Sequence, residues 1–167
     1  MGPSGSGKTT IGRLLSDKIC GTFFDIDQII IEKEKKTISE IFEMKGVNYF
    51  REKEVEVVKN LNYSCDYINI VSLGGGSITQ SYILDSINSK GLKIYLEVDV
   101  ETAINRISNF KDRPLLLYDK PEIAWTELFV KRKTIYENCD LKINSDNSID
   151  EICKQIIEFI TNWSNVF

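Results

Sequence analysis

Short apolar runs and longer amphipathic segments alternate along this chain. The short runs are rich in β-branched and aromatic residues, which is the pattern of buried strands. They lie at Thr22–Asp25, Tyr67–Ser72, Lys93–Val98 and Leu141–Ile143. Segments with helical spacing of apolar residues lie at Thr9–Leu15, Ile38–Phe42, Phe50–Leu61, Ser81–Ser89, Glu101–Ile107, Pro121–Asn138 and Ile149–Ile160. An alternation of strands and helices predicts an α/β fold around a parallel sheet.

Two interruptions of this pattern carry further information. Gly46 separates the helical segments on either side of it, so we expect a break in the helix there. Residues 108–120 are polar and contain Pro114, and loops of this length are often functional lids. The chain has 167 residues, of which 42% are apolar, and it fits a single domain over residues 1–167.

Charge and cysteine content exclude several classes of protein. The net charge is -4 and the pI is about 5.0, which argues against a nucleic-acid surface. No apolar stretch approaches a membrane span, and the start lacks a secretion signal. Cys20, Cys65, Cys139 and Cys153 form no C-x-x-C pair, and histidine is absent, so we expect reduced packing cysteines and no zinc site. We therefore expect a cytoplasmic protein without nucleic-acid or membrane partners, and we take it to act as a monomer.

The segment Gly2–Thr9 reads GPSGSGKT and matches the phosphate-binding pattern GxxxxGK[ST] at every defined position. Backbone N–H groups of such a loop cradle phosphate oxygens, the lysine reaches the β- and γ-phosphates, and the hydroxyl binds Mg2+. The helix that follows directs the positive end of its dipole at the phosphates. We predict ATP or GTP binding by Gly5, Ser6, Gly7, Lys8, Thr9 and Thr10.

A loop of this kind normally follows a buried parallel strand, but only Met1 precedes Gly2 here. Either the true start lies further upstream, or the sheet has a gap in its centre. Because an internal gap leaves backbone groups unpaired, we expect an N-terminally truncated domain that lacks its first strand.

Downstream motifs give the chain a family resemblance. They are, in order, Phe24-Asp25-Ile26-Asp27, Ile38-x-x-Ile41-Phe42, Gly46, Phe50-Arg51-x-x-Glu54, Gly74-Gly75-Gly76, Arg113-Pro114-Leu115-Leu116 and Arg132-x-x-x-Tyr136. This series resembles the shikimate kinases over nearly the whole chain. The resemblance implies transfer of the γ-phosphoryl group of ATP to the 3-hydroxyl of shikimate, a step of aromatic amino-acid biosynthesis. It also implies a three-layer α/β/α P-loop kinase fold with a short parallel sheet in the order 2-3-1-4-5, of which strand 1 is missing here.

The resemblance implies which residues bind shikimate. Arg51 and Arg132 stand at the positions that clamp its carboxylate, a task for which a planar guanidinium fork is suited. Asp27 stands at the position that accepts hydrogen bonds from the ring hydroxyls and is the candidate to orient or deprotonate the attacking one. A substrate-binding helical segment spans about residues 28–61. Three glycines without side chains are expected to let the substrate approach the backbone closely: Gly74, Gly75 and Gly76.

The resemblance also implies a metal and nucleotide site. Asp25 matches the aspartate that holds Mg2+ through water, with Thr9 as the other metal residue. Two residues apart, Asp25 and Asp27 are expected on the same face of the strand end.

The lid at about 108–120 resembles the segment that closes over the phosphates. Arg113 stands at its catalytic position, and Arg106 stands where an arginine stacks on adenine. Lys8, Asp27 and Arg113 are then the candidate catalytic residues, because phosphoryl transfer depends mainly on positioning and charge neutralisation.

Alternative functions fit parts of the same motif set. Taken singly, the arginines fit surface salt bridges and Asp27 fits a helix N-cap. A gluconate-type or other small-molecule kinase shares the phosphate loop and acidic strand end but does not need Arg51 and Arg132. Guanylate kinase shares the start of the chain but not the later motifs. A non-catalytic paralogue would be expected to have lost Lys8, Asp27 or an arginine, and all of them are present.

Overall fold

The computed structural model describes residues 1–64, 66–107 and 121–164. The expected lid at 108–120, with Arg113, Pro114, Leu115 and Leu116, lies outside the described residues. The elements are α1 (Lys8–Lys18), β1 (Thr22–Asp25), α2 (Ile26–Glu34), α3 (Ile38–Lys59), β2 (Asn69–Ser72), the 3-10 turn η1 (Ser77–Thr79), α4 (Ser81–Lys90), β3 (Ile94–Glu97), α5 (Val100–Ile107), α6 (Pro121–Glu137), β4 (Leu141–Asn144) and α7 (Ile149–Ser164). In this part of the chain, every helix is too short or too polar to cross a membrane.

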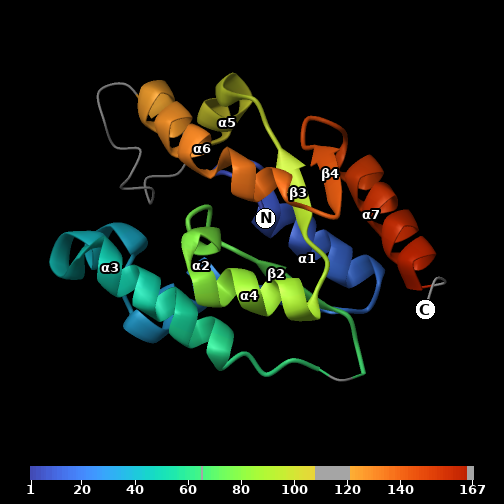
Figure 1. Ribbon diagram of the computed structural model, residues 1–167, viewed down its shortest axis with the longest axis horizontal. Coiled ribbons are helices and arrows are strands. Elements are labelled where there is room, and N and C mark those ends of the chain that lie inside the picture. Colours follow the sequence, from blue (N-terminus) through green and yellow to red (C-terminus); the bar gives the residue numbers. More distant parts are fainter. Residues whose placement is uncertain (65, 108–120, 165–167) are drawn as a thin grey trace.

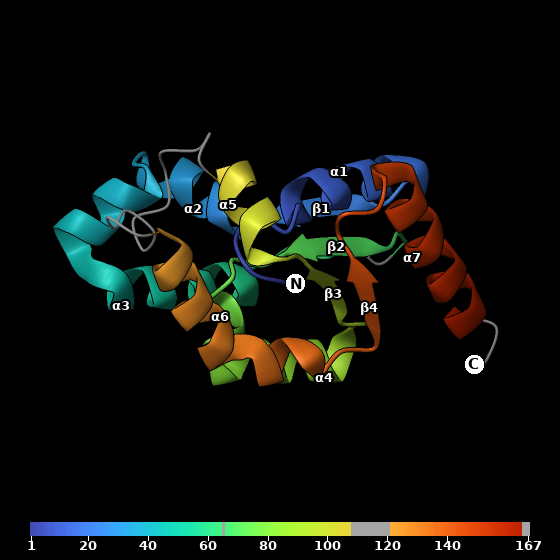
Figure 2. The same cartoon turned by 90° about the horizontal axis from the view of Figure 1, so that it is seen from above.

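The described strands form two parallel pairs. Strands β1 and β2 pair with Phe23 opposite Ile70, and β3 and β4 pair with Leu96 opposite Ile143. The backbone of Met1 lies along β3, where its carbonyl accepts a hydrogen bond from the Leu96 N–H at 2.9 Å. In both ribbon views the N-terminus lies between β2 and β3 (Figures 1 and 2). In the expected order 2-3-1-4-5, β1 and β2 take the places of strands 2 and 3, and β3 and β4 take those of strands 4 and 5. Met1 lies at the place of the expected strand 1.

Helices cover both sides of the strands, which gives the expected three layers (Figure 2). Helices α1 and α7 contact each other and pack on one side, where α1 contacts β1 and β2 and α7 contacts β4. Their apolar stripe holds Ile11, Leu15 and Ile152 against Leu96 and Ile143. On the other side lie α4 and α6 (Figure 2), and together with α2 and α3 they contribute to a second, larger apolar cluster. Burial of these two clusters is the main favourable contribution to folding.

Local sequence signals explain the helix boundaries near the site. Thr37 and Glu40 form a reciprocal capping box at the start of α3, which satisfies backbone N–H groups that the first turn leaves unpaired. Gly46 has φ 80° and ψ 169° within α3, so the predicted break between two helical segments is confirmed. The free thiols among the described residues are exposed Cys20, half-buried Cys139 and buried Cys153.

The expectation that Asp25 and Asp27 share one face of a strand end is wrong. Strand β1 ends at Asp25, whose Oδ1 accepts a hydrogen bond of 3.2 Å from the Gln28 N–H and so caps α2. Because aspartate is a strong N-cap, the helix begins directly after the strand. Asp27 therefore lies in the first turn of α2, and the residue that caps the helix is Asp25.

Candidate active site

The phosphate loop is shaped by glycines in the left-handed region. Gly5 has φ 82° and Gly7 has φ 81°, conformations that side-chain-bearing residues rarely adopt. Lys8 folds back over the loop, where its ammonium donates a hydrogen bond of 2.7 Å to the Pro3 carbonyl. Helix α1 begins at Lys8, so its N-terminal end faces the space that the loop encloses. This geometry is suited to binding the phosphates of a nucleotide.

Thr9 and Asp25 meet beside this loop. The Thr9 hydroxyl donates a hydrogen bond of 2.6 Å to Oδ2 of Asp25. Mg2+ prefers oxygen ligands and usually takes only one or two from the protein, with phosphates and water completing its shell. The Thr9 hydroxyl and the Asp25 carboxylate offer oxygens of this kind at one place, which fits a magnesium ion that arrives with the nucleotide.

The glycine triplet after β2 lies against the predicted substrate-binding side chains. A Cβ built at Gly74 would lie 2.6 Å from Oδ1 of Asp27, and one at Gly76 would lie 2.6 Å from Cζ of Arg51. A Cβ at Gly75 would lie 3.5 Å from the carbonyl oxygen of Gly2 in the phosphate loop. The triplet thus brings Asp27 and Arg51 together at the edge of the phosphate loop.

Arg51 is held by a buried carboxylate. Its Nη1 donates a hydrogen bond of 2.5 Å to Oε2 of Glu54, and the Ser77 hydroxyl donates one of 2.5 Å to Oε1. Glu54 is fully buried, and this burial raises the pKa of its carboxyl group, while the charge of Arg51 opposes the rise. The Phe50 ring lies beside the Arg51 guanidinium, with Cζ 5.7 Å from the ring centroid. Phe50 in turn packs edge-to-face on Phe42, with ring centroids 5.1 Å apart.

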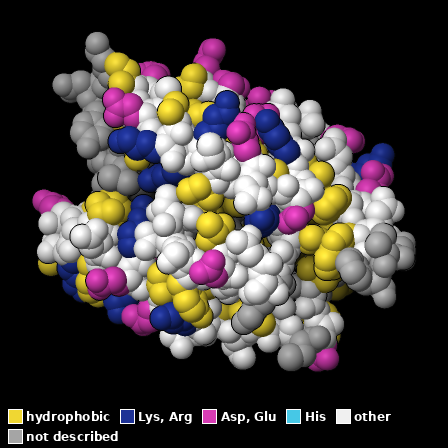
Figure 3. Space-filling model, viewed as in Figure 1, with side chains coloured by type: hydrophobic (Ala, Val, Ile, Leu, Met, Phe, Trp, Pro, Cys, Tyr) yellow, Lys and Arg dark blue, Asp and Glu magenta, His cyan; other side chains and the backbone are white. Residues whose placement is uncertain are grey.

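Helix α6 brings the second predicted arginine to the same place. The Tyr136 hydroxyl donates a hydrogen bond of 2.6 Å to the Gly75 carbonyl. Burial raises the pKa of Tyr136 to about 12, and the nearby charges of Arg132 and Arg51 both oppose that rise. Lys and Arg side chains gather between α6 and α3 (Figure 3). The structure therefore places Arg132 near the glycine triplet, together with Arg51.

Arg106 joins the phosphate loop to the segment before α7. Its guanidinium donates hydrogen bonds to the carbonyl of Gly5 at 3.2 Å and the carbonyl of Ser145 at 3.0 Å. It also pairs with Asp146 at 3.4 Å. Arg106 thus lies at the phosphate-loop end of the site, where it contacts the loop backbone directly.

Sequence reasoning missed two contacts that organise the site. The Trp125 indole donates to the Ser4 carbonyl at 3.0 Å, and Tyr136 donates to Gly75. The pattern Arg132-x-x-x-Tyr136 was a signal for the second, since residues four apart share a helix face. Trp125 gave no comparable signal.

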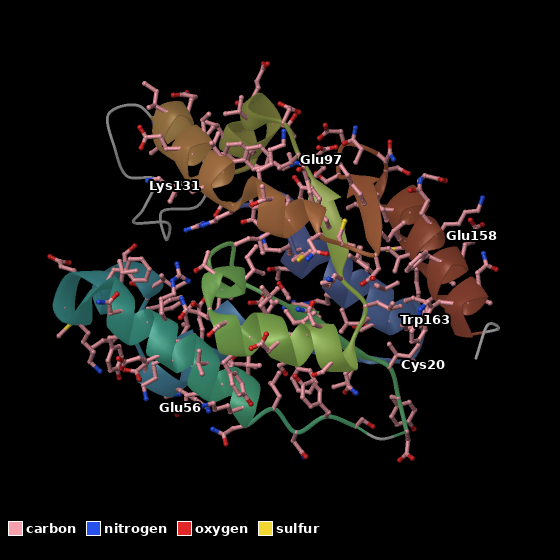
Figure 4. All side chains as sticks on the ribbon, viewed as in Figure 1. Cys20, Glu56, Glu97, Lys131, Glu158 and Trp163 are labelled. Carbon is pink, nitrogen blue, oxygen red and sulfur yellow. The ribbon has the colours of Figure 1, made fainter. Side chains whose placement is uncertain are left out.

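A cavity of about 630 Å3 lies between α3 and Gln80, the residue that follows η1. Of the predicted site residues, its lining contains Arg51 alone, and its other residues include Glu52, Glu56 and Lys59. Glu56 lies on the side of α3 that faces away from α6 (Figure 4). Arg51 therefore both lines this cavity and lies against Gly76 of the glycine triplet.

A three-layer fold with a nucleotide loop at one end of its strands is shared by P-loop kinases. The solved structure of a deoxyadenosine kinase from M. mycoides, 18% identical, has a TM-score of 0.62 over 97% of this chain and 96% of that chain, which shows the fold alone. The structure of shikimate kinase from Acinetobacter baumannii in complex with shikimate has a TM-score of 0.90 and 31% identity, over 96% of this chain and 90% of that chain.

Sequence comparison defines the family. The family model for shikimate kinase matches residues 4–161. The shikimate kinase of Aquifex aeolicus is 34% identical over 152 residues, which cover 91% of this chain and 88% of that protein. The chain belongs to the shikimate kinase family.

Proposed function

We propose that this protein transfers the γ-phosphoryl group of ATP to the 3-hydroxyl of shikimate, giving shikimate 3-phosphate and ADP. The observation that supports this most is the contact of Asp27 and Arg51 with one glycine triplet, which itself touches the phosphate loop. Donor and acceptor sites are then neighbours, as phosphoryl transfer requires.

On the acceptor side, Arg51 and Arg132 bind the shikimate carboxylate through charge-assisted hydrogen bonds. Because Gly74, Gly75 and Gly76 have no side chains, Asp27 and Arg51 lie directly against their backbone, and the ring binds next to this backbone. Asp27 accepts a hydrogen bond from the 3-hydroxyl, which orients its oxygen toward the γ-phosphorus and provides an acceptor for its proton.

On the donor side, the loop N–H groups and Lys8 bind the phosphates, and Thr9 and Asp25 hold Mg2+, Asp25 through water. The bound ion neutralises charge on the β- and γ-phosphate oxygens. We further propose that Arg106 stacks on adenine and that Arg113, outside the described residues, closes over the phosphates. All these groups belong to one chain, so a monomer is sufficient for the reaction, and we propose that it works in the cytoplasm, where ATP is available.

A coupled ADP-release assay across hydroxy acids tests this function. With ATP and Mg2+ present, shikimate should stimulate ADP release, while gluconate and buffer alone should not. Lys8→Ala serves as the background control, because it removes a cation that the proposed reaction needs. Equal stimulation by gluconate would favour a gluconate-type kinase, and no stimulation by any acid would favour the non-catalytic paralogue.

A further inference from the structure

Helix α6 contacts both the phosphate loop and the glycine triplet. We propose that it fixes the position of one relative to the other, with Trp125 and Tyr136 as positioning residues. This inference rests on the proposed function and goes beyond it, because both side chains act through the protein backbone. Trp125 holds the Ser4 carbonyl of the phosphate loop, and Tyr136 holds the Gly75 carbonyl of the glycine triplet.

Trp125 is well placed to hold the phosphate loop. Its side chain is 4% exposed and packs with Val98 and Ala103 in a small apolar cluster. Its indole N–H donates to the Ser4 carbonyl at 3.0 Å, and an indole has no other polar group. The backbone of Ala103 meanwhile closes on Gly5, where a Cβ would lie 2.6 Å from the Ala103 carbonyl oxygen. Helices α5 and α6 therefore hold the loop from the same side.

Tyr136 is equally well placed to hold the glycine triplet. Its side chain is fully buried and stacks on Tyr95, with ring centroids 5.4 Å apart and planes 13° apart. Burial raises its pKa to about 12, so the hydroxyl stays protonated and donates at physiological pH. Its hydrogen bond of 2.6 Å to the Gly75 carbonyl lies in the middle of the triplet.

The two contacts are linked through one row of aromatic rings. Phe129 stacks on Trp125 at 5.2 Å and on Tyr136 at 6.4 Å. Tyr136 follows Trp125 by eleven positions, about three helical turns or roughly 16 Å along the axis, so both project from one face. Arg132 lies on the same face of α6, between the two contacts.

Such a link matters because phosphoryl transfer depends on alignment. A misplacement of about 1 Å between reacting groups can lower the rate about a hundredfold. A helix packed on both loops limits their relative movement, and it moves Arg132 together with them. Loss of either hydrogen bond should therefore reduce turnover and also weaken the binding of the substrate on that side.

The test compares Tyr136→Phe and Trp125→Phe with the wild-type full chain. Each variant keeps an aromatic ring in the row and removes one donor, which leaves a carbonyl without that partner. We expect each to lower kcat, and each to lower kcat/KM for its own substrate about tenfold. Tyr136→Phe should raise KM for shikimate but not for ATP, and Trp125→Phe should do the reverse.

Tyr95→Phe is the matched control. Tyr95 is 1% exposed and stacks on Tyr136, but within the described part of the chain its hydroxyl has no hydrogen-bond partner. Its removal should leave kcat and both KM values unchanged. If Tyr136→Phe and Trp125→Phe lower only the melting temperature, or change both KM values equally, the positioning role is overturned.

Failure of the proposed function gives a different result. In that case the wild-type protein itself does not phosphorylate shikimate. Even then, the dissociation constant for MgATP, measured by calorimetry, tests whether Trp125 positions the phosphate loop. A weaker constant for Trp125→Phe but not for Tyr136→Phe supports it, and equal constants for all three proteins contradict it.

Discussion

The hydroxyl of Thr9 lies 2.6 Å from Oδ2 of Asp25, so the first turn of α1 and the end of β1 meet at one pair of oxygen atoms. The other oxygen of Asp25 caps α2. One carboxylate thus fixes the start of the helix that carries Asp27 and offers an oxygen for a metal ion beside the phosphate loop.

Asp25→Asn separates these two functions. Asparagine is as good an N-cap as aspartate, so the melting temperature should change little. Loss of the negative charge should weaken the hold on Mg2+, lower kcat roughly ten- to a hundredfold and raise the Mg2+ concentration needed for half-maximal rate. A magnesium titration of the initial rate checks this, and an unchanged titration curve would exclude Asp25 from the metal site.

Gly76→Ala should displace Arg51. The backbone of Gly76, with φ -104°, accepts alanine, but the new Cβ would lie 2.6 Å from Cζ of Arg51. The guanidinium must move, and we expect KM for shikimate to rise at least about tenfold with KM for ATP unchanged.

Gly91→Ala is the control for this substitution. The nearest atom to its Cβ would be the Ile87 carbonyl oxygen at 3.9 Å, so ordinary kinetics are expected. A Gly76→Ala variant with wild-type kinetics would show that Arg51 does not bind the substrate from its present position.

Glu54→Gln should damage both stability and shikimate binding. The carboxylate is fully buried and pairs with Arg51, whose side chain is 14% exposed. Removal of one partner of a buried pair leaves an uncompensated charge and costs roughly 3 kcal/mol. Urea unfolding should reveal that loss, and steady-state kinetics should show a higher KM for shikimate. Glu52→Gln, on the exposed surface of the same helix, should change neither quantity.

Stability should depend on pH through a cluster that spans the break at Gly46. Glu34 at the end of α2 accepts hydrogen bonds of 2.8 Å from Lys45 and Tyr49, on either side of that glycine. These bonds hold the pKa of Glu34 below its ordinary value of 4.5. The folded state therefore binds this proton less tightly than the unfolded state, so the contribution is present above pH 4.5 and is lost as pH falls through the lower, folded pKa.

Melting temperatures of the wild type and Glu34→Gln check this sign. The variant should melt at a lower temperature at pH 7, and the difference should shrink as pH falls below 4.5. Because the charged partners are partly exposed, added salt should also reduce it. A difference that grows in acid would contradict the assignment.

Local sequence patterns predicted most of the helices and strands, because the conformational preferences of neighbouring residues determine where these elements form and end. Strand β1 was predicted with its observed bounds, and Gly46 was identified as a break because glycine tolerates a positive φ. The family motifs placed Asp27, Arg51 and Arg132 in one site, and the structure brings them together around the glycine triplet.

The sequence failed to predict features of the site that depend on contacts between distant residues, or on a residue that serves two elements at once. Asp25 ends a strand and caps a helix in one step, which a strand periodicity of two cannot anticipate. Tyr136 and Gly75 are 61 residues apart, and Trp125 and Ser4 are 121 apart. Such pairs depend on how the layers pack, which no local pattern of the sequence encodes.

Phosphorus NMR of a reaction with ATP, Mg2+ and shikimate identifies the group that receives the phosphate, and so decides whether this protein phosphorylates the 3-hydroxyl of shikimate. We expect one new phosphomonoester signal, coupled to the proton at C3 of the ring, that grows in step with ADP. ADP formation accompanied only by inorganic phosphate, or no ADP at all with properly folded protein, would contradict it.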